Sequence, residues 1–244
     1  MRDLLAMPRV DAPEILDSDA CSPTDIEATL LDLGRVNRWF GGVATTQKMV
    51  ERVAHVSGSK RFSLLEVAAG SGEVPEVVRQ KLARRGITLD VTLLDRARSH
   101  LPSANHAGRN AGVVADALAL PFDDGAFDLV SCSLFVHHLN IQQVAQFVRE
   151  GLRVSRRALL INDLIRHPLH LALAFAGFPL MRSRVAWLDG LTSVRRAYIP
   201  DEIRTMLVSV ISANAGTHVE ISRNYLFRMG VIVWSKPLGV GRHE

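Results

Sequence analysis

Hydrophobic and polar positions change period several times along the middle of this chain. The run RFSLLEVAA, residues 61–69, is short and apolar, as expected of a buried strand. It is followed by EVPEVVRQKLARRG, residues 73–86, with apolar residues at helical spacing, and by ITLDVTLLD, residues 87–95, a second apolar run. A strand, a helix and a strand in succession form a βαβ unit, which implies a parallel sheet with helices on its faces.

The same alternation continues toward the C-terminus. It predicts strands at GVVAD, FDLVSCSLF and RRALLINDL, and a helix over about 140–153. Near the end, THVEISRN and YLFRMGVIVW are two strand-like runs joined by a short polar turn, which predicts an antiparallel pair and hence an antiparallel strand at the edge of the parallel sheet. The predicted fold class is α/β: a doubly wound, Rossmann-like, mostly parallel sheet with an antiparallel C-terminal strand pair.

Two segments before the first strand lack this alternation. Residues 1 to about 24 mix Pro, Asp and Ser without a period, which predicts a poorly ordered or loosely docked lead-in. Residues 26–56 have apolar positions at helical spacing, interrupted by Gly41 and Gly42, and predict two helices that form an N-terminal cap. The predicted division is a lead-in and cap at 1–60, a sheet domain at 61–235 with a helical lid insertion at 164–200, and a tail at 236–244.

The composition is that of a globular protein and does not favour nucleic-acid binding. Of the 244 residues, 48% are hydrophobic and 22% are charged, as in ordinary globular proteins. Lys and Arg exceed Asp and Glu by 29 − 25 = 4, without an aromatic-interleaved basic stripe, which argues against a nucleic-acid partner. The only two cysteines, Cys21 and Cys132, are not spaced as in a disulfide framework or a thiolate zinc site, so neither is predicted. Acidic residues and Pro interrupt the first twenty positions, unlike a signal peptide, so we expect a cytoplasmic location.

The stretch LLEVAAGSGEVP, residues 64–75, forms the first turn between a strand and a helix, where open α/β sheets bind their ligands. Gly70 and Gly72 permit positive φ and a close approach of backbone to ligand. A dinucleotide fingerprint needs a third Gly near position 75, but Pro75 stands there and suits the first turn of a helix. Glu66 would repel a pyrophosphate and suits a cationic or amino-bearing ligand.

Glu66-Val67-Ala68-Ala69-Gly70-Ser71-Gly72 resembles the first motif of the class I S-adenosylmethionine-dependent methyltransferases. That motif is an acidic residue followed by G-x-G-x-G, and it surrounds the methionine end of the cofactor. Ala68 departs from it by replacing the first glycine, and Ala is the least disruptive replacement. The resemblance implies that Glu66, Ala68, Gly70 and Gly72 bind S-adenosylmethionine.

Further segments extend the resemblance over roughly residues 61–235. Asp95, followed by Arg96, matches the acidic residue that binds both ribose hydroxyls. Asp116 and Ala117 resemble the family's D-A-x-x-L-P-F segment, which holds the adenine edge. Ser133 ends the predicted fourth strand, beside the transferable methyl group. LFVHHL, residues 134–139, is a variant of the L-H-H-L ending of the ubiquinone- and menaquinone-methylase-like branch, and the terminal hairpin fits the family's inserted last strand.

This resemblance implies a methyltransferase that converts S-adenosylmethionine to S-adenosylhomocysteine. We expect an apolar small-molecule acceptor and O-methylation of a phenolic, polyketide or quinone-type compound. C- or N-methylation of a small metabolite is the alternative within this family. Alternatives from other classes are an NAD-dependent oxidoreductase, favoured by the Gly-x-Gly turn and Asp95, and a non-catalytic cofactor-binding or membrane-associated protein. Taken singly, Asp95 also fits a helix cap and Asp116 a turn residue.

A phenol has a pKa of about 10 and gains from a nearby base that titrates near neutrality. The candidate bases are His137 and then His167, with Asp163 as the carboxylate that orients the imidazole. Because neighbouring residues point in different directions, at most one of His137 and His138 is expected to face the acceptor, and packing of the following helix is the other reading. No i, i+4 pair of histidines with a carboxylate is formed, so no metal site is predicted.

The segment Pro168 to Met181 is hydrophobic all round, so it must be buried or touch lipid. As a helix it would span only ~21 Å, against ~30 Å of bilayer hydrocarbon, which excludes a membrane span. Insertions at this place roof the acceptor pocket in the methyltransferases that the chain resembles, so we interpret the segment as a lid. Contact with a membrane surface and a dimer contact are the less favoured alternatives, and we expect a monomer or a homodimer. Arg38 and Trp39 either cover the cofactor or dock the cap.

Overall fold

A computed structural model describes residues 7–17, 21–102, 112–211 and 217–235, and the predicted tail at 236–244 lies outside them. Seven strands form one sheet in the order β3-β2-β1-β4-β5-β7-β6. The strands are β1 Arg61–Val67, β2 Thr88–Asp95, β3 Val113–Val114, β4 Phe127–Ser133, β5 Ser155–Leu164, β6 His218–Asn224 and β7 Arg228–Trp234. The pairs among β1 to β5 are parallel, and β7 is antiparallel to both β5 and β6. The predicted fold class is confirmed.

One detail of the sheet differs from the prediction, because the antiparallel strand is not at the edge. All of β7, RMGVIVW, is buried, whereas β6 is at most half-buried along its length. A strand without exposed positions needs a neighbour on each side, so β7 is inserted between β5 and β6. The less buried β6 forms the edge.

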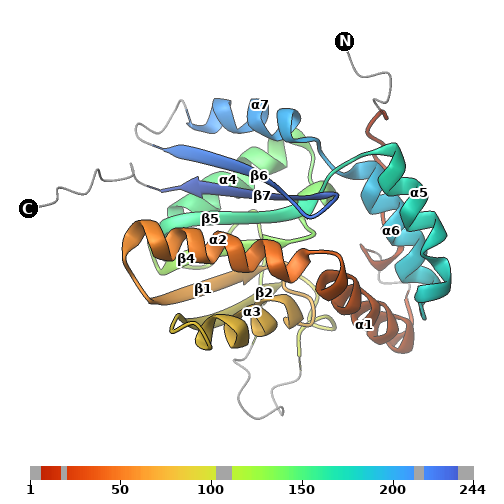
Figure 1. Ribbon diagram of the computed structural model, residues 1–244, viewed down its shortest axis with the longest axis horizontal. Helices are drawn as coiled ribbons and strands as arrows, with labels where there is room; N and C mark the ends of the chain where they lie inside the picture. The colour runs from red at the N-terminus through yellow and green to blue at the C-terminus, as the bar shows by residue number, and fades with distance from the viewer. Residues whose placement is uncertain (1–6, 18–20, 103–111, 212–216, 236–244) are drawn as a thin grey trace, which may run out of the picture.

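Helices cover both faces of the sheet (Figure 1). They are α1 Pro23–Trp39, α2 Gly42–Ser57, α3 Glu73–Ala83, α4 Ile141–Val154, α5 Pro168–Ala176, α6 Arg184–Arg196 and α7 Pro200–Ile211, with 3₁₀ turns η1 Ile15–Asp17, η2 Val136–His138 and η3 Phe178–Leu180. α2 and α3 pack with Phe62 and Leu64 on one face, and α4 and α7 pack with Leu65 and Val67 on the other, as the alternation of side chains along β1 requires. None of the described helices is both long and apolar enough to cross a membrane.

The two predicted N-terminal helices are present, but they do not form one cap. Val50 and Val53 of α2 are fully buried in the core that α2 shares with α3 and the sheet. Gly41, with φ of 80°, redirects the chain between the two helices. Of these two helices, α1 lies beyond the end of the sheet and α2 lies on its face (Figure 1). Figure 1 shows α1, α5 and α6 gathered at this end.

The described part of the lead-in, residues 7–17, is anchored, so the expectation of loose docking is wrong there. The guanidinium of Arg9 donates to the carbonyl oxygens of His137 and Leu139 at 3.0 and 3.1 Å. The backbone N–H groups of Ile15 and Leu16 donate to the carboxylate of Asp189 on α6 at 2.7 and 2.9 Å. These contacts join positions more than 120 residues apart in the chain, and hydrophobic periodicity carries no signal for them.

Candidate active site

A cavity of about 1010 Å³ lies at the carboxyl ends of β1, β2 and β4. Its cover comes from α1, from residues 14–17 and from the loops that follow these strands. Eight of the nine predicted cofactor-binding residues line it: Glu66, Ala68, Gly70, Asp95, Arg96, Asp116, Ala117 and Ser133. The topology therefore brings segments that are separated by up to 67 positions in the sequence to one cavity.

The first turn keeps the backbone of a glycine-rich loop although Ala68 replaces a glycine. Ala68 has φ of 52° and Gly70 has φ of 53°, both in the left-handed region. This conformation costs a residue with a Cβ about 1–2 kcal/mol, which is why glycine is the usual choice at such a position. The departure at Ala68 therefore leaves the course of the turn unchanged and adds backbone strain.

Gly72 is the predicted cofactor residue that does not line the cavity. It precedes α3 with φ of 69°, and an added Cβ would lie 2.5 Å from Cδ1 of Leu93 on β2. The left-handed φ favours glycine at this position, and the end of the Leu93 side chain would have to shift to admit a Cβ. These two features account for the glycine, and its contact with the cofactor stays a prediction.

Glu66 is a buried carboxylate without a positive partner among the described residues. It is 1% exposed, and the hydroxyl of Ser131 on β4 donates a hydrogen bond to its Oε2. Burial raises its pKa to about 7, although hydrogen bonding opposes the rise. Because a buried carboxylate is costly to ionise alone, an ammonium group of a ligand in the cavity would supply the missing charge. This is the arrangement expected for the methionine end of S-adenosylmethionine.

Asp95 ends β2 and ties two loops together. Its Oδ2 accepts the N–H of Gly70 and its Oδ1 accepts the N–H of Ala97, both at 2.9 Å. Burial alone would raise the pKa of Asp95, but these bonds and the nearby His100 hold it below its usual value. Each carboxylate oxygen retains a lone pair for a further donor. The residue therefore fits the predicted contact with two ribose hydroxyls, and His100 is a neighbour that the sequence did not indicate.

Asp116 and Ala117 follow β3 on the same side of the cavity. Oδ1 of Asp116 accepts the N–H of Leu118 at 2.8 Å, which fixes the turn, and the side chain is otherwise exposed. Its second oxygen is free of hydrogen bonds within the described residues. Asp116 can therefore fix the turn with one oxygen and bind a ligand with the other.

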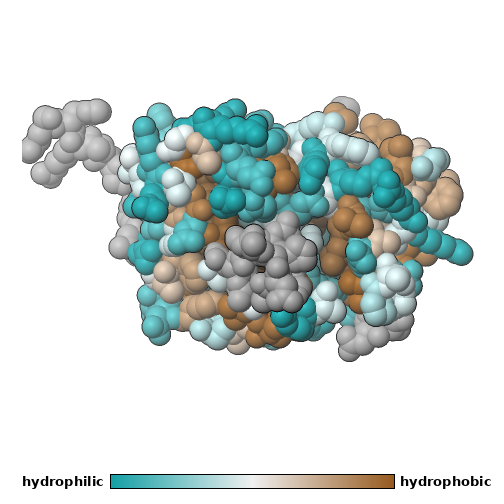
Figure 2. Space-filling view, turned by 90° about the horizontal axis from the view of Figure 1, so that it is seen from below, coloured by the Kyte–Doolittle hydropathy of each residue, from teal (hydrophilic) through white to brown (hydrophobic). Residues whose placement is uncertain are grey.

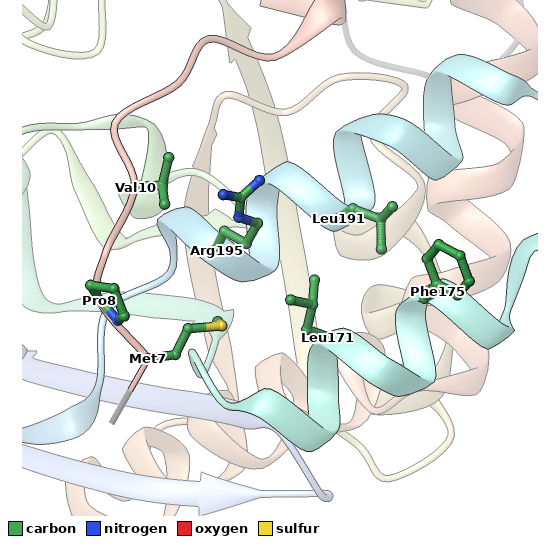
Figure 3. Close-up of a pocket in the computed structure, with 7 residues that line it drawn as sticks. All are labelled: Met7, Pro8, Val10, Leu171, Phe175, Leu191 and Arg195. Carbon is green, nitrogen blue, oxygen red and sulfur yellow. The ribbon is translucent and has the colours of Figure 1, made fainter. Parts of the chain in front are cut away.

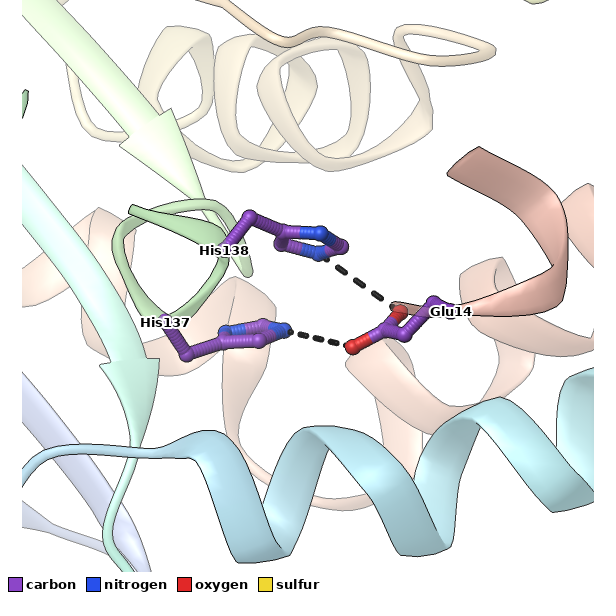
Figure 4. Close-up of side chains that lie close together, drawn as sticks. All are labelled: Glu14, His137 and His138. Carbon is purple, nitrogen blue, oxygen red and sulfur yellow. Dashed lines mark ion pairs between the residues drawn. The ribbon is translucent and has the colours of Figure 1, made fainter. Parts of the chain in front are cut away.

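His137 lies between two carboxylates, and all three side chains are buried. Its Nδ1 lies 2.7 Å from Oδ1 of Asp163, whose Oδ2 accepts the backbone N–H of His137 at 2.9 Å. Its Nε2 lies 3.3 Å from Oε1 of Glu14 (Figure 4). Burial alone would lower the pKa of His137, but Asp163 and Glu14 outweigh burial and raise it to about 9. The imidazole is thus protonated at neutral pH while Glu14 stays in place.

The other two predicted catalytic residues lie outside the cavity lining, in different ways. Asp163 lies behind His137 and holds the ring from Nδ1, as the predicted orienting role requires. His167 caps α5 by accepting the N–H of Leu169 at 3.1 Å, and its ring stacks on Phe227. The fold thus groups His137 with Asp163 and does not bring His167 to them.

Glu14 is the functional candidate that the sequence did not reveal. It sits in an aperiodic lead-in, and only the docking of residues 7–17 brings it to His137. It also lies 3.6 Å from Nε2 of His138, whose Nδ1 is 3.0 Å from Asp17. The ligand atoms of Glu14, His137 and His138 lie within 4.8 Å of one another, close enough to hold a metal ion. Ion pairs already account for this grouping, and the absence of a metal stays a prediction.

The segment predicted to be the lid contributes little to the cavity. Of residues 164–200, all within the described ranges, only Ser193 on α6 lines it. α5 faces a separate groove of about 460 Å³, together with residues 7–10 and α6 (Figure 3). Arg38 and Trp39 do not line the cavity either: Nε of Arg38 pairs with Glu73 at 2.5 Å, and Trp39 lies under the guanidinium of Arg35. The cover consists of α1 and the lead-in instead.

Part of this chain is similar to known methyltransferases. A family described as a methyltransferase domain matches residues 65–158. The demethylmenaquinone methyltransferase of Renibacterium salmoninarum is 30% identical over 149 residues, which cover 61% of this chain and 56% of that protein. The ubiquinone/menaquinone biosynthesis C-methyltransferase UbiE of Citrifermentans bemidjiense is 30% identical over 119 residues, 47% of each protein. The chain thus spans about half the length of the curated relatives it matches.

Solved structures support the same fold. The plantazolicin methyltransferase BpumL, in complex with S-adenosylhomocysteine, superposes with a TM-score of 0.65 at 12% identity, covering 90% of this chain and 92% of that one. A SAM-dependent methyltransferase from Aquifex aeolicus superposes with a TM-score of 0.54 at 13% identity, covering 88% of this chain and 98% of that one. The predicted resemblance to class I methyltransferases is confirmed.

Proposed function

We propose that this chain, which carries a class I S-adenosylmethionine-dependent methyltransferase domain, methylates a hydroxyl group of an apolar small molecule. The observation that carries the proposal is the single cavity that unites the buried Glu66 and Asp95 and the exposed Asp116 on one side with the buried His137 on the other. The first three match the chemistry of the cofactor's ammonium, ribose and adenine groups. His137 is the reactive side chain available for the acceptor.

S-adenosylmethionine supplies an electrophilic methyl group, which is displaced in line by the acceptor and leaves S-adenosylhomocysteine. The protein's contribution is to align the acceptor with the cofactor and to exclude water. The turn at 68–70 would hold the methionine end against Glu66, and Asp95 would hold the ribose. Ser133, at the end of β4, would lie on the side of the cavity where methyl transfer occurs.

The cover of the cavity favours an apolar acceptor. The hydrophobic side chains that line it beside His137 and along α1 are Leu16, Ile26, Leu30, Leu33, Phe135 and Leu139. Such a wall accepts an aromatic or aliphatic body. The acceptor's hydroxyl would be recognised at His137, and Gln143 and Ser193 are further polar side chains in the lining.

For His137 to take a proton from the acceptor, the carboxylate of Glu14 must leave Nε2, because both groups compete for that atom. Withdrawal of Glu14 also removes one of the two negative charges that raise the pKa of His137. The imidazole then titrates closer to neutrality, while Asp163 still fixes its orientation. We propose that Glu14 contacts Nε2 of His137 until the acceptor binds and then yields to the acceptor hydroxyl.

The same phenolate can react at oxygen or at a ring carbon, and the named relatives include a C-methyltransferase. Deprotonation by His137 serves both outcomes, so the geometry of the acceptor in the cavity decides between them. We favour O-methylation, with C-methylation as the second candidate. A cytoplasmic location and a monomer or homodimer remain predictions.

Calorimetry and product analysis test this function. The full chain is expected to bind S-adenosylmethionine and S-adenosylhomocysteine and to leave NADH unbound. With cofactor carrying a ¹³C-labelled methyl group, a panel of apolar phenols should yield a methylated product, and NMR assigns the label to oxygen or carbon. If neither form of the cofactor binds, the proposed function is wrong. Binding without turnover on any phenol would favour a non-catalytic role.

Replacement of Glu14 by Gln is expected to shift the acidic limb of the pH profile of kcat/KM to lower pH. In the wild type this limb should lie near the His137 pKa of about 9. Loss of the Glu14 charge lowers that pKa, so the limb should move down by about 1 pH unit or more. Asp17→Asn is the control, since Asp17 pairs with His138. An unchanged limb in Glu14→Gln would contradict the link between Glu14 and the base.

A further inference from the structure

The segment formed by α5 and η3 presents an apolar surface that no described part of the chain covers. Its large exposed side chains are Leu169, Leu173, Phe175, Phe178 and Leu180, and Phe175 is 65% exposed. The remaining exposed residues of the segment are Ala172, Ala176 and Pro179, so every exposed position is apolar. We call these residues the apolar face. Surface helices normally carry polar residues on their solvent side, which this segment lacks.

The apolar face lies at the end of the molecule that holds the cavity. In Figure 2, hydrophobic side chains gather at the right-hand end, where Figure 1 places α5. The face continues into the groove of about 460 Å³ between α5, α6 and residues 7–10, to which Phe175 also contributes. Six of the seven residues that line this groove are apolar, and the seventh is Arg195. A continuous apolar surface thus runs from η3 to the lead-in.

Exposed arginines border the apolar face. No Asp or Glu occurs between Asp163 and Asp189 in the sequence. Arg182 and Arg184, just after the face, and Arg195, in the groove, are exposed and form no ion pair with a described carboxylate. Two acidic groups on neighbouring elements are engaged: Asp32 accepts the N–H groups of Arg182 and Ser183, and Asp189 accepts those of residues 15 and 16.

We propose that the apolar face, with Arg182, Arg184 and Arg195 around it, docks onto the surface of membranes that contain anionic lipids. Exposed leucine and phenylalanine side chains would enter the boundary between headgroups and acyl chains, and the arginines would pair with lipid phosphates. α5 has 9 residues and would extend only ~14 Å along its axis, so it lies in the interface and does not cross it.

The charge pattern argues against a second copy of this chain as the partner. A two-fold dimer sets the same patch against itself, so Arg182, Arg184 and Arg195 would approach their own copies. An anionic lipid surface provides both the apolar layer and the counter-charge. The docking is independent of the proposed reaction, although it would place the cavity end of the sheet next to the lipid.

Sedimentation with lipid vesicles tests the proposal on the full chain. Binding is expected for vesicles of phosphatidylcholine and phosphatidylglycerol in equal parts. It should fall at least tenfold for pure phosphatidylcholine and fall with rising salt, because exposed charges are screened. Trp187 packs on Phe175 and Phe178 with ring centroids 5.7 and 4.8 Å apart, so brominated lipids should quench its fluorescence.

Variants separate the apolar and the basic contributions. Leu173→Asn with Phe175→Asn, and separately Arg182→Glu with Arg184→Glu, should each lower vesicle binding at least tenfold and leave cofactor affinity unchanged. Val56→Asn, an exposed apolar residue on α2, is the matched control and should bind like the wild type. The proposal is overturned if wild-type protein does not bind anionic vesicles at low salt, or if both double variants bind as well as the wild type. It is also overturned if light scattering shows a dimer that the apolar variant abolishes, since a second copy would then cover the face.

Discussion

Replacement of Asp95 by Ala is expected to weaken the binding of S-adenosylhomocysteine by about 100-fold or more. The two ribose hydroxyls would each lose a hydrogen bond to a charged carboxylate, worth about 1.5–3 kcal/mol apiece, and 1.4 kcal/mol corresponds to a factor of ten. The lowered pKa of Asp95 keeps it charged at neutral pH, so the whole effect should be present there. Calorimetry of the folded variant measures it.

Asp95 also holds the N–H groups of Gly70 and Ala97, so a loss of affinity by itself would not separate a ribose contact from a distorted loop. An analogue of S-adenosylhomocysteine that lacks both ribose hydroxyls makes the distinction. Wild-type protein should prefer the natural compound strongly, and Asp95→Ala should show little preference. Asp90→Ala, an exposed residue on the same strand, is the control and should keep full affinity. An undiminished preference in Asp95→Ala would refute the ribose contact.

Replacement of His137 by Asn is expected to lower kcat by about 100-fold or more, while cofactor affinity stays the same. The Asn amide can take the place of Nδ1 and donate to Asp163, but it offers nothing at the position of Nε2. Asn is chosen because removing every partner of the buried carboxylates of Asp163 and Glu14 would destabilise the fold. Single-turnover kinetics with a phenolic acceptor measures the effect.

A merely structural role for His137 predicts a different pattern. If His137 removes a proton, the defect of His137→Asn should shrink with acceptors of lower phenol pKa, because these ionise without help. His167→Asn is the matched control, since His167 lies outside the cavity lining, and it should remain within about twofold of wild type, as expected of a residue remote from the chemistry. Equal defects on all phenols, or an equal loss in His167→Asn, would contradict the assignment.

The sequence was informative wherever local rules apply. Periodicity located β1, α3 and β2 because burial of alternate or every fourth residue is a property of each element by itself. The cofactor side of the cavity was predictable for the same reason, since Glu66, Asp95 and Asp116 each lie at or just after the carboxyl end of a strand, and parallel strands end at one edge of the sheet. Gly72 was identified as important, but its left-handed φ and its contact with Leu93 became visible only in the structure.

Only the tertiary structure decided the acceptor side. Glu14 reaches His137 because the lead-in docks on α6 and on the loop after β4, through contacts that no periodicity encodes. The resulting pair of carboxylates, and not the histidine itself, sets its protonation state. In the same way, the sequence predicted that the apolar stretch beginning at Pro168 is a lid, but only the tertiary structure shows that Leu171 and Phe175 line a groove separate from the cavity. The local sequence determines whether a segment forms a helix or a strand. Contacts between distant segments determine which residues each face of that helix or strand packs against.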